Sequence, residues 1–188
     1  MDTLLIYLFA MTITPGPNTI LSMANAAAVG LRKGIWLNIG MLVGLTAVTA
    51  IAYIASASLY ALIPSIEPWL KAIGAAYLVY LAYRTYRKGS IETEEKSAGF
   101  AEGMILQLIN VKVHILALTA ISTMIIPAYE GTAIRIAISM LIPLACFAGG
   151  LVWAVGGSLL SGIYQKHGKA IGIIMALLLI YTAIRFFV

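Results

Sequence analysis

Long stretches without any charged side chain restrict what this chain can fold into more than any other feature. No charged residue occurs from Thr3 to Leu31, and none occurs from Gly34 to Ile66. Apolar stretches of about 18 or more residues are typical of membrane-spanning helices. Of the 188 residues, 62% are hydrophobic and only 10% are charged, whereas soluble domains carry about 25% charged residues. We therefore expect an all-α, polytopic membrane protein.

Hydrophobicity predicts six spans that fall into two halves. Residues 1–86 would form a first three-helix repeat, 87–100 a cytoplasmic linker, and 101–188 a second three-helix repeat. A signal peptide is the alternative for the first segment, but its N-terminus lacks the basic residues that such a peptide needs. The spans run approximately over 3–27, 35–60, 68–86, 101–126, 132–158 and 168–187.

Lysine and arginine predict the orientation of these spans. Eight basic residues lie in the first, third and fifth connections, three lie on the opposite side, and Lys112 lies within a span. Basic loops face the cytoplasm, so both termini are expected outside. The net charge of +5 comes from residues in membrane-flanking turns, and we therefore expect no nucleic-acid partner.

The ends of the two halves are similar. Residues 71–87 and 169–185 both begin Lys-Ala-Ile-Gly and share seven identities in seventeen positions. Because each half has an odd number of spans, the second half must be inverted in the membrane. Inverted repeats are common in transporters. This arrangement predicts that Asn18 and Asn110 lie near each other at mid-depth.

A proline cluster interrupts the first span, at Thr14-Pro15-Gly16-Pro17-Asn18. Proline has no N–H, so the carbonyls of Met11 and Ile13 lose their helical donors. Open backbone groups at membrane depth are tolerated only against protein or a wet cavity, and broken helices form the binding sites of many transporters. Thr14, Pro15, Gly16, Pro17 and Asn18 are therefore candidate substrate-binding residues.

The fourth span carries a polar cluster, Gln107, Asn110, Lys112 and His114. A lysine at the bilayer centre costs roughly 2.5–3.5 kcal/mol, and no Asp or Glu lies deep in a predicted span to pair with it. A ligand carboxylate would supply the missing charge. The alternative is that Lys112 snorkels, or bonds to carbonyls of the broken first helix. His114 faces another direction, and it is either a proton-coupling residue or a packed histidine.

Small residues recur at helical spacing in two of the spans. Gly30, Gly34, Gly40 and Gly44 form one series, and two glycine pairs at 149–150 and 156–157 form another. This pattern favours close helix packing. Pro143 is expected to kink the fifth span or to mark a hinge in it.

These motifs together resemble the lysine exporter and homoserine/threonine resistance superfamily. The resemblance rests on Pro15-Gly16-Pro17-Asn18, the glycines up to Gly44, Gly74-Ala75-Ala76-Tyr77-Leu78, and residues Gln107 to Lys112. Asn110-Val111-Lys112, residues 119–123 and residues 177–181 are most similar to the cysteine/O-acetylserine exporter branch. Most relatives have Asn-Pro-Lys in the fourth span. Because Val111 replaces that proline, we expect the fourth helix to be less broken than the first.

The resemblance implies a secondary transporter of the bacterial inner membrane that exports amino acids, driven by the proton motive force. Without a deep carboxylate, small neutral amino acids fit better than cationic ones. The expected partners are the amino-acid substrate and the lipid bilayer, a homodimer is left open, and no cofactor or metal is expected. The alternatives are a channel, a structural membrane subunit or an intramembrane enzyme. One cysteine and two distant histidines argue against metal-dependent chemistry.

Overall fold

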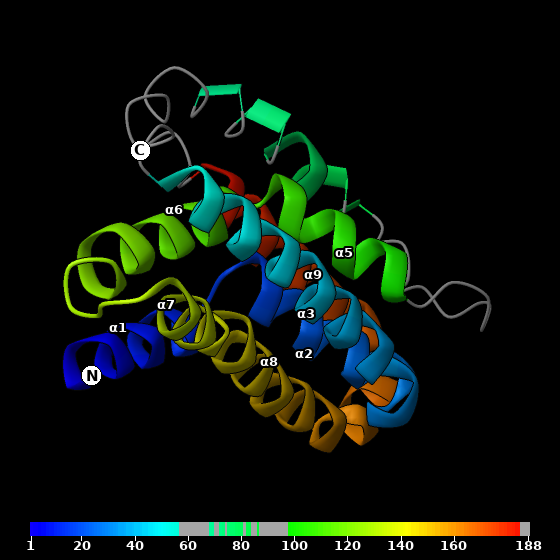
Figure 1. Cartoon of the computed structure of the whole chain (residues 1–188). Helices are drawn as coiled ribbons and strands as arrows, with labels where there is room; N and C mark the ends of the chain where they lie inside the picture. The colour runs from blue at the N-terminus through cyan, green and yellow to red at the C-terminus, as the bar shows by residue number, and fades with distance from the viewer. Residues whose placement is uncertain are drawn as a thin grey trace.

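The computed structural model describes residues 1–56, 68–69, 72–73, 75–80, 82–83, 86 and 98–184, and this part of the chain contains helices and no strand (Figure 1). Much of the predicted linker, and several residues of the 71–87 and 169–185 comparison, lie outside the described residues. The helices are α1 (Asp2–Ile13), α2 (Pro17–Val29), α3 (Leu31–Ile54), α5 (Phe100–Ile109), α6 (Val111–Thr119), the π-helical η1 (Ala120–Ile125), α7 (Thr132–Ser139), α8 (Leu141–Leu159) and α9 (Ser161–Ile184).

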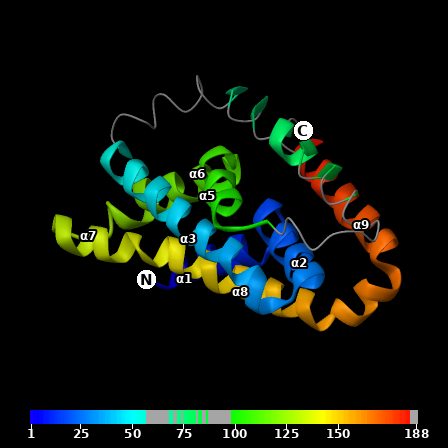
Figure 2. The same cartoon turned by 90° about the vertical axis from the view of Figure 1, so that its right-hand side faces the viewer.

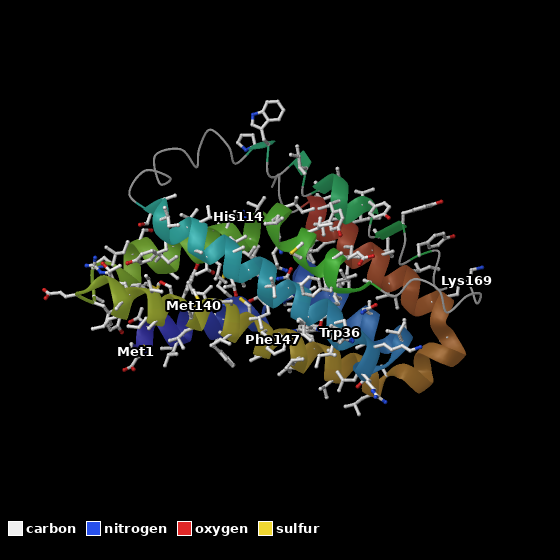
Figure 3. All side chains as sticks on the ribbon, turned by 45° about the vertical axis from the view of Figure 1, so that its right-hand side comes forward. Met1, Trp36, His114, Met140, Phe147 and Lys169 are labelled. Atoms are coloured by element: carbon white, nitrogen blue, oxygen red, sulfur yellow. The ribbon has the colours of Figure 1, made fainter. Side chains whose placement is uncertain are left out.

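Several of these helices are suited to a membrane. The helices over Leu31–Ile54 and Thr132–Leu159 are long and apolar enough to cross one. Two further pairs of helices are bent at a short break, and if each pair is one span, the described residues contain four spans. Large apolar side chains, Trp36 among them, are exposed to the surroundings (Figure 3). The chain is therefore a membrane protein, while six spans and an inverted repeat stay predictions.

Two helix pairs are sharply bent at a short break, as Figure 1 shows for α1–α2 and α5–α6. The bend between α1 and α2 is 51°, and the bend between α5 and the segment Val111–Ile125 is 65°. The first break follows from Pro15 and Pro17, which remove two helical donors. The expectation that the fourth span is less broken than the first is wrong, because its bend is the larger one.

Asn110 takes the role in the second break that a proline has in the first. Its backbone is extended, with φ −84° and ψ 99°. Its side-chain oxygen accepts the backbone N–H of Lys112 at 3.1 Å, which is the hydrogen bond of a helix N-cap. Asparagine is among the preferred N-cap residues, so α6 begins afresh after Asn110 although Val111 is compatible with a continuous helix.

Buried apolar side chains form two clusters. The first contains Ile20 of α2, Leu37 of α3 and Leu106 of α5, together with Leu78 from the predicted third span and Leu179 of α9. Figure 2 shows the described part of residues 68–86 running beside α9. We name the second one the outer cluster; its members include Leu8, Leu45, Val48, Val113, Leu116, Ile121 and Ile142.

Glycines allow two helix pairs to approach closely. A Cβ atom on Gly40 of α3 would overlap the carbonyl of Phe100, one on Gly103 would overlap that of Leu37, and one on Gly157 of α8 would overlap that of Met23. The predicted packing role is thus confirmed at Gly40 and Gly157. It is wrong at Gly156, where a Cβ meets open space, and at Gly30, which forms the turn after α2 with φ +79°.

A single turn residue, Met140, separates α7 from α8 in the fifth predicted span, and its backbone remains in the helical region at φ −67° and ψ −14°. Pro143 has no N–H for the carbonyl of Ser139, so the helical ladder is interrupted one turn before the proline. Residues Thr132–Leu159 still form one helix long enough to span a membrane, and the kink predicted at this proline stays a prediction.

Candidate functional site

The ends of the two broken helices meet through side-chain amides. Asn18, in the first turn of α2, donates through Nδ2 to Oε1 of Gln107 in α5 at 3.0 Å. Asn110, at the second break, donates through Nδ2 to Oδ1 of Asn18 at 2.9 Å. The predicted proximity of Asn18 and Asn110 is confirmed. Gln107 and Asn110 are buried and Asn18 is half-buried, so these hydrogen bonds fix the two breaks against each other.

Lys112 reaches from the second break to the first. Its Nζ donates to the carbonyl oxygen of Thr14 at 3.1 Å, the residue that ends α1. The ammonium therefore lies at the negative end of the α1 dipole, where a cation is stabilised. This is the bond to the broken first helix that the alternative interpretation of Lys112 described. No carboxylate of the described residues forms an ion pair with this ammonium.

The chain at the first break lies close to this lysine. A Cβ atom added to Gly16 would be 3.2 Å from Lys112 Nζ, so glycine leaves room for the ammonium. The N–H of Gly16 donates to the hydroxyl of Thr19 at 2.9 Å, and that hydroxyl donates to the Gly16 carbonyl at 3.0 Å. Pro17 occupies the first turn of α2, where its missing N–H removes no helical hydrogen bond.

A cavity opens where the breaks meet, with about 560 Å³ of empty space including the part open to the surroundings. Six of the residues that the sequence predicts for the substrate site line this cavity: Gly16, Pro17, Asn18, Gln107, Asn110 and Lys112.

The other predicted residues lie beside the cavity. Thr14 contributes its carbonyl to Lys112, while its hydroxyl donates to the carbonyl of Ala10 at 2.6 Å. Pro15 and His114 are not part of the cavity lining. Nδ1 of His114 lies 3.0 Å from the carbonyl oxygen of Asn110, so this ring contacts the second break from outside the cavity.

Several cavity residues come from helices that the sequence did not connect to the site. Asn38 of α3 lines the cavity, as do Cys146 and Phe147 of α8; Figure 3 shows Phe147 on that helix. Asn38 was detectable as a lone amide in an uncharged span. No sequence signal marks Phe147, because an apolar residue in a spanning helix can equally face lipid or a neighbouring helix.

Comparison with known proteins identifies the family. Residues 9–188 match the model of the LysE type translocators. The chain belongs to this family. Its relatives include the cysteine/O-acetylserine efflux protein of Salmonella typhimurium, 34% identical, and that of Escherichia coli K12, 31% identical. Each match spans 183 residues, which are 96% of this chain and 94% of the relative. No solved structure gives a significant match.

In this LysE type translocator, Gln107 brings to the cavity a buried donor that no described residue accepts. Nε2 of Gln107 is buried and has no hydrogen-bond partner in the structure. Leaving a buried donor unsatisfied costs roughly 1–3 kcal/mol. A bound ligand with an acceptor oxygen would remove that penalty.

Among the described residues no group of three or more His, Cys, Asp or Glu side chains could hold a metal ion.

Proposed function

We propose that this translocator is a secondary transporter that exports small neutral amino acids, or derivatives such as O-acetylserine, across the bacterial cytoplasmic membrane by alternating access. The proposal is supported by the family, by the efflux relatives, and above all by the cavity where the two broken helices meet. A channel is the competing interpretation, and the vesicle experiment below separates it from a transporter.

The two breaks offer both charges that a zwitterion needs. The N-terminal end of α2, near Asn18, is the positive end of a helix dipole, and such ends bind carboxylates. Lys112 Nζ uses one of its three N–H donors on Thr14, so two others are available to the same carboxylate. The orphan Nε2 of Gln107 adds a neutral donor.

The substrate ammonium has acceptors at the negative end of α1. The carbonyls of Met11 and Ile13 have no helical donor, because Pro15 and Pro17 carry no N–H. Met11 lines the cavity whereas Ile13 does not, so the proposed acceptor at the cavity edge is the carbonyl of Met11. Because no described residue brings a carboxylate to the lining, a cationic side chain would find no counter-charge there, which favours neutral substrates over lysine or arginine.

The membrane arrangement is part of the same proposal. We place residues 1–86 and 101–188 as inverted repeats about the linker 87–100, in the inner membrane with both termini outside. Two broken spans that meet at one cavity are what an inverted repeat produces. We assign no enzymatic activity to the chain.

Transport by purified protein in lipid vesicles tests the proposal. We expect saturable movement of neutral amino acids that accelerates under an imposed pH gradient, while lysine and the methyl esters of the same amino acids are transported poorly. Flux that stays proportional to concentration would indicate a channel. Absence of flux for every amino acid, or hydrolysis of an added peptide in detergent, would contradict the proposal.

A further inference from the structure

The cavity lining contains polar and apolar side chains. Asn18, Gln107, Asn110 and Lys112 bring amide and ammonium groups to it, and we name these four residues the polar side. We name Leu45 of α3, with Val113 and Leu116 of α6, the apolar wall. Leu116 lies one helical turn beyond Lys112 on the same face of α6. All three wall residues are at least 97% buried, with exposures of 1%, 3% and 1%.

The apolar wall continues into protein. Its three side chains belong to the outer cluster, against which Met11 and Cys146 are also packed. Aliphatic side chains have neither donors nor acceptors, and the N–H of Val113 already donates to the carbonyl of Asn110 at 3.1 Å. A polar group placed against this wall would therefore lose its water without gaining a partner.

From this arrangement we infer that the substrate's side chain lies against the apolar wall, and that the site selects aliphatic or thioether side chains over hydroxylated ones of the same shape. The inference rests on the proposed function, since it takes the zwitterionic head to bind at the polar side. Once the head is held there, a substrate side chain that extends one turn along α6 meets the apolar wall.

The expected discrimination is moderate. A hydrophobic pocket rejects an isostere that adds a hydroxyl by about 10²-fold at most. A cavity that is partly open to the surroundings retains some water, so we expect a preference of about tenfold, near the value of one lost hydrogen bond.

Two isosteric amino acids measure this preference directly. L-Norvaline and L-homoserine have side chains of equal length that differ only by a terminal methyl or hydroxyl group. We expect the vesicle-reconstituted protein to transport norvaline about tenfold faster than homoserine at low, equal concentrations. Equal rates, or faster homoserine transport, would overturn the inference.

Two matched variants test whether the apolar wall causes the preference for norvaline over homoserine. Val113→Thr exchanges a methyl for a hydroxyl on the apolar wall while keeping the side-chain shape. Val48→Thr makes the same exchange in the outer cluster at a residue that does not line the cavity. The first should lower the norvaline-to-homoserine ratio at least threefold, and the second should leave it unchanged. A ratio that moves equally in both variants would contradict the wall assignment.

This experiment separates the inference from the proposed function. If alanine, norvaline and homoserine all move at similar saturable rates, the protein is an amino-acid transporter and the inference fails alone. If none of them moves in vesicles that contain monodisperse, inserted protein, the proposed function fails.

Discussion

Lys112 is the charged residue at the centre of the site, and the structure gives it a protein partner. Its Nζ donates to the Thr14 carbonyl at 3.1 Å, which explains how the charge is tolerated without a ligand. The same bond brings the ammonium beside Gly16, on the cavity wall. If Lys112 only stabilises the end of α1, its removal should leave transport unchanged. If it also binds the substrate carboxylate, its removal should reduce transport.

Replacing the lysine distinguishes these two roles. Lys112→Met removes the ammonium and keeps the length of the side chain. If Lys112 binds the substrate carboxylate, amino-acid export should fall at least tenfold, about 1.4 kcal/mol, while insertion is preserved because a charge has left the membrane. Initial rates in vesicles, normalised to inserted protein, measure the effect.

Lys112→Arg is the matched control, since it keeps the charge but presents a wider, planar group. It should be impaired less than Lys112→Met. Normal export by Lys112→Met, with an unchanged preference for an amino acid over its methyl ester, would assign the lysine to the end of α1 only.

Among the elements, the break between α1 and α2 exists because of two prolines. Replacing both Pro15 and Pro17 with alanine supplies the missing N–H groups and removes the steric conflict. A continuous helix would use the carbonyls of Met11 and Ile13 internally and would move Asn18 away from Gln107. We expect normal insertion and a loss of most transport, measured by membrane expression and vesicle flux. A double variant that transports at the parent rate would show that the break is only a packing kink.

Close packing of α2 on α8 gives a second prediction at this scale. Gly157→Ala places a methyl group against the carbonyl of Met23, whereas Gly156→Ala, one residue earlier, meets open space. Overpacking costs typically about 1–3 kcal/mol, so the thermal midpoint in detergent should fall for Gly157→Ala and stay within about 1 °C of the parent for Gly156→Ala. Equal midpoints for both variants would show that the helices separate at no cost.

For the whole molecule, the predicted orientation is tested by labelling. Lys33, Glu130 and His167 are exposed in the structure and lie in the first, fourth and fifth connections. In a Cys146→Ser background, cysteines at positions 33 and 167 should react with a membrane-impermeant maleimide only from the cytoplasmic side, and a cysteine at 130 only from the outside. Labelling of 33 and 167 from opposite sides would exclude the proposed topology.

Much of this protein is determined by its sequence alone. Uncharged apolar stretches require membrane helices, because about 20 helical residues span the hydrocarbon. The Pro15 and Pro17 break follows from the missing N–H groups, whatever surrounds it. The polar residues of the site could also be predicted from the sequence, because amides and a lysine are rare in apolar spans. The family assignment made from them is confirmed.

Tertiary structure decided what depends on neighbours. The sharper bend at Asn110 comes from the hydrogen bond between its side chain and the N–H of Lys112. This N-cap starts a new helix at a point where Val111 is also compatible with a continuous one. The exclusion of His114 from the cavity and the inclusion of Phe147 depend on how the helices are rotated. In an almost uniformly apolar chain, hydrophobicity does not distinguish a helix face turned to lipid from one turned to protein. Close contacts between helices, such as those at Gly40 and Gly157, fix that rotation. The hydrophobic effect does not, because lipid tails are as apolar as the leucine side chains of a neighbouring helix.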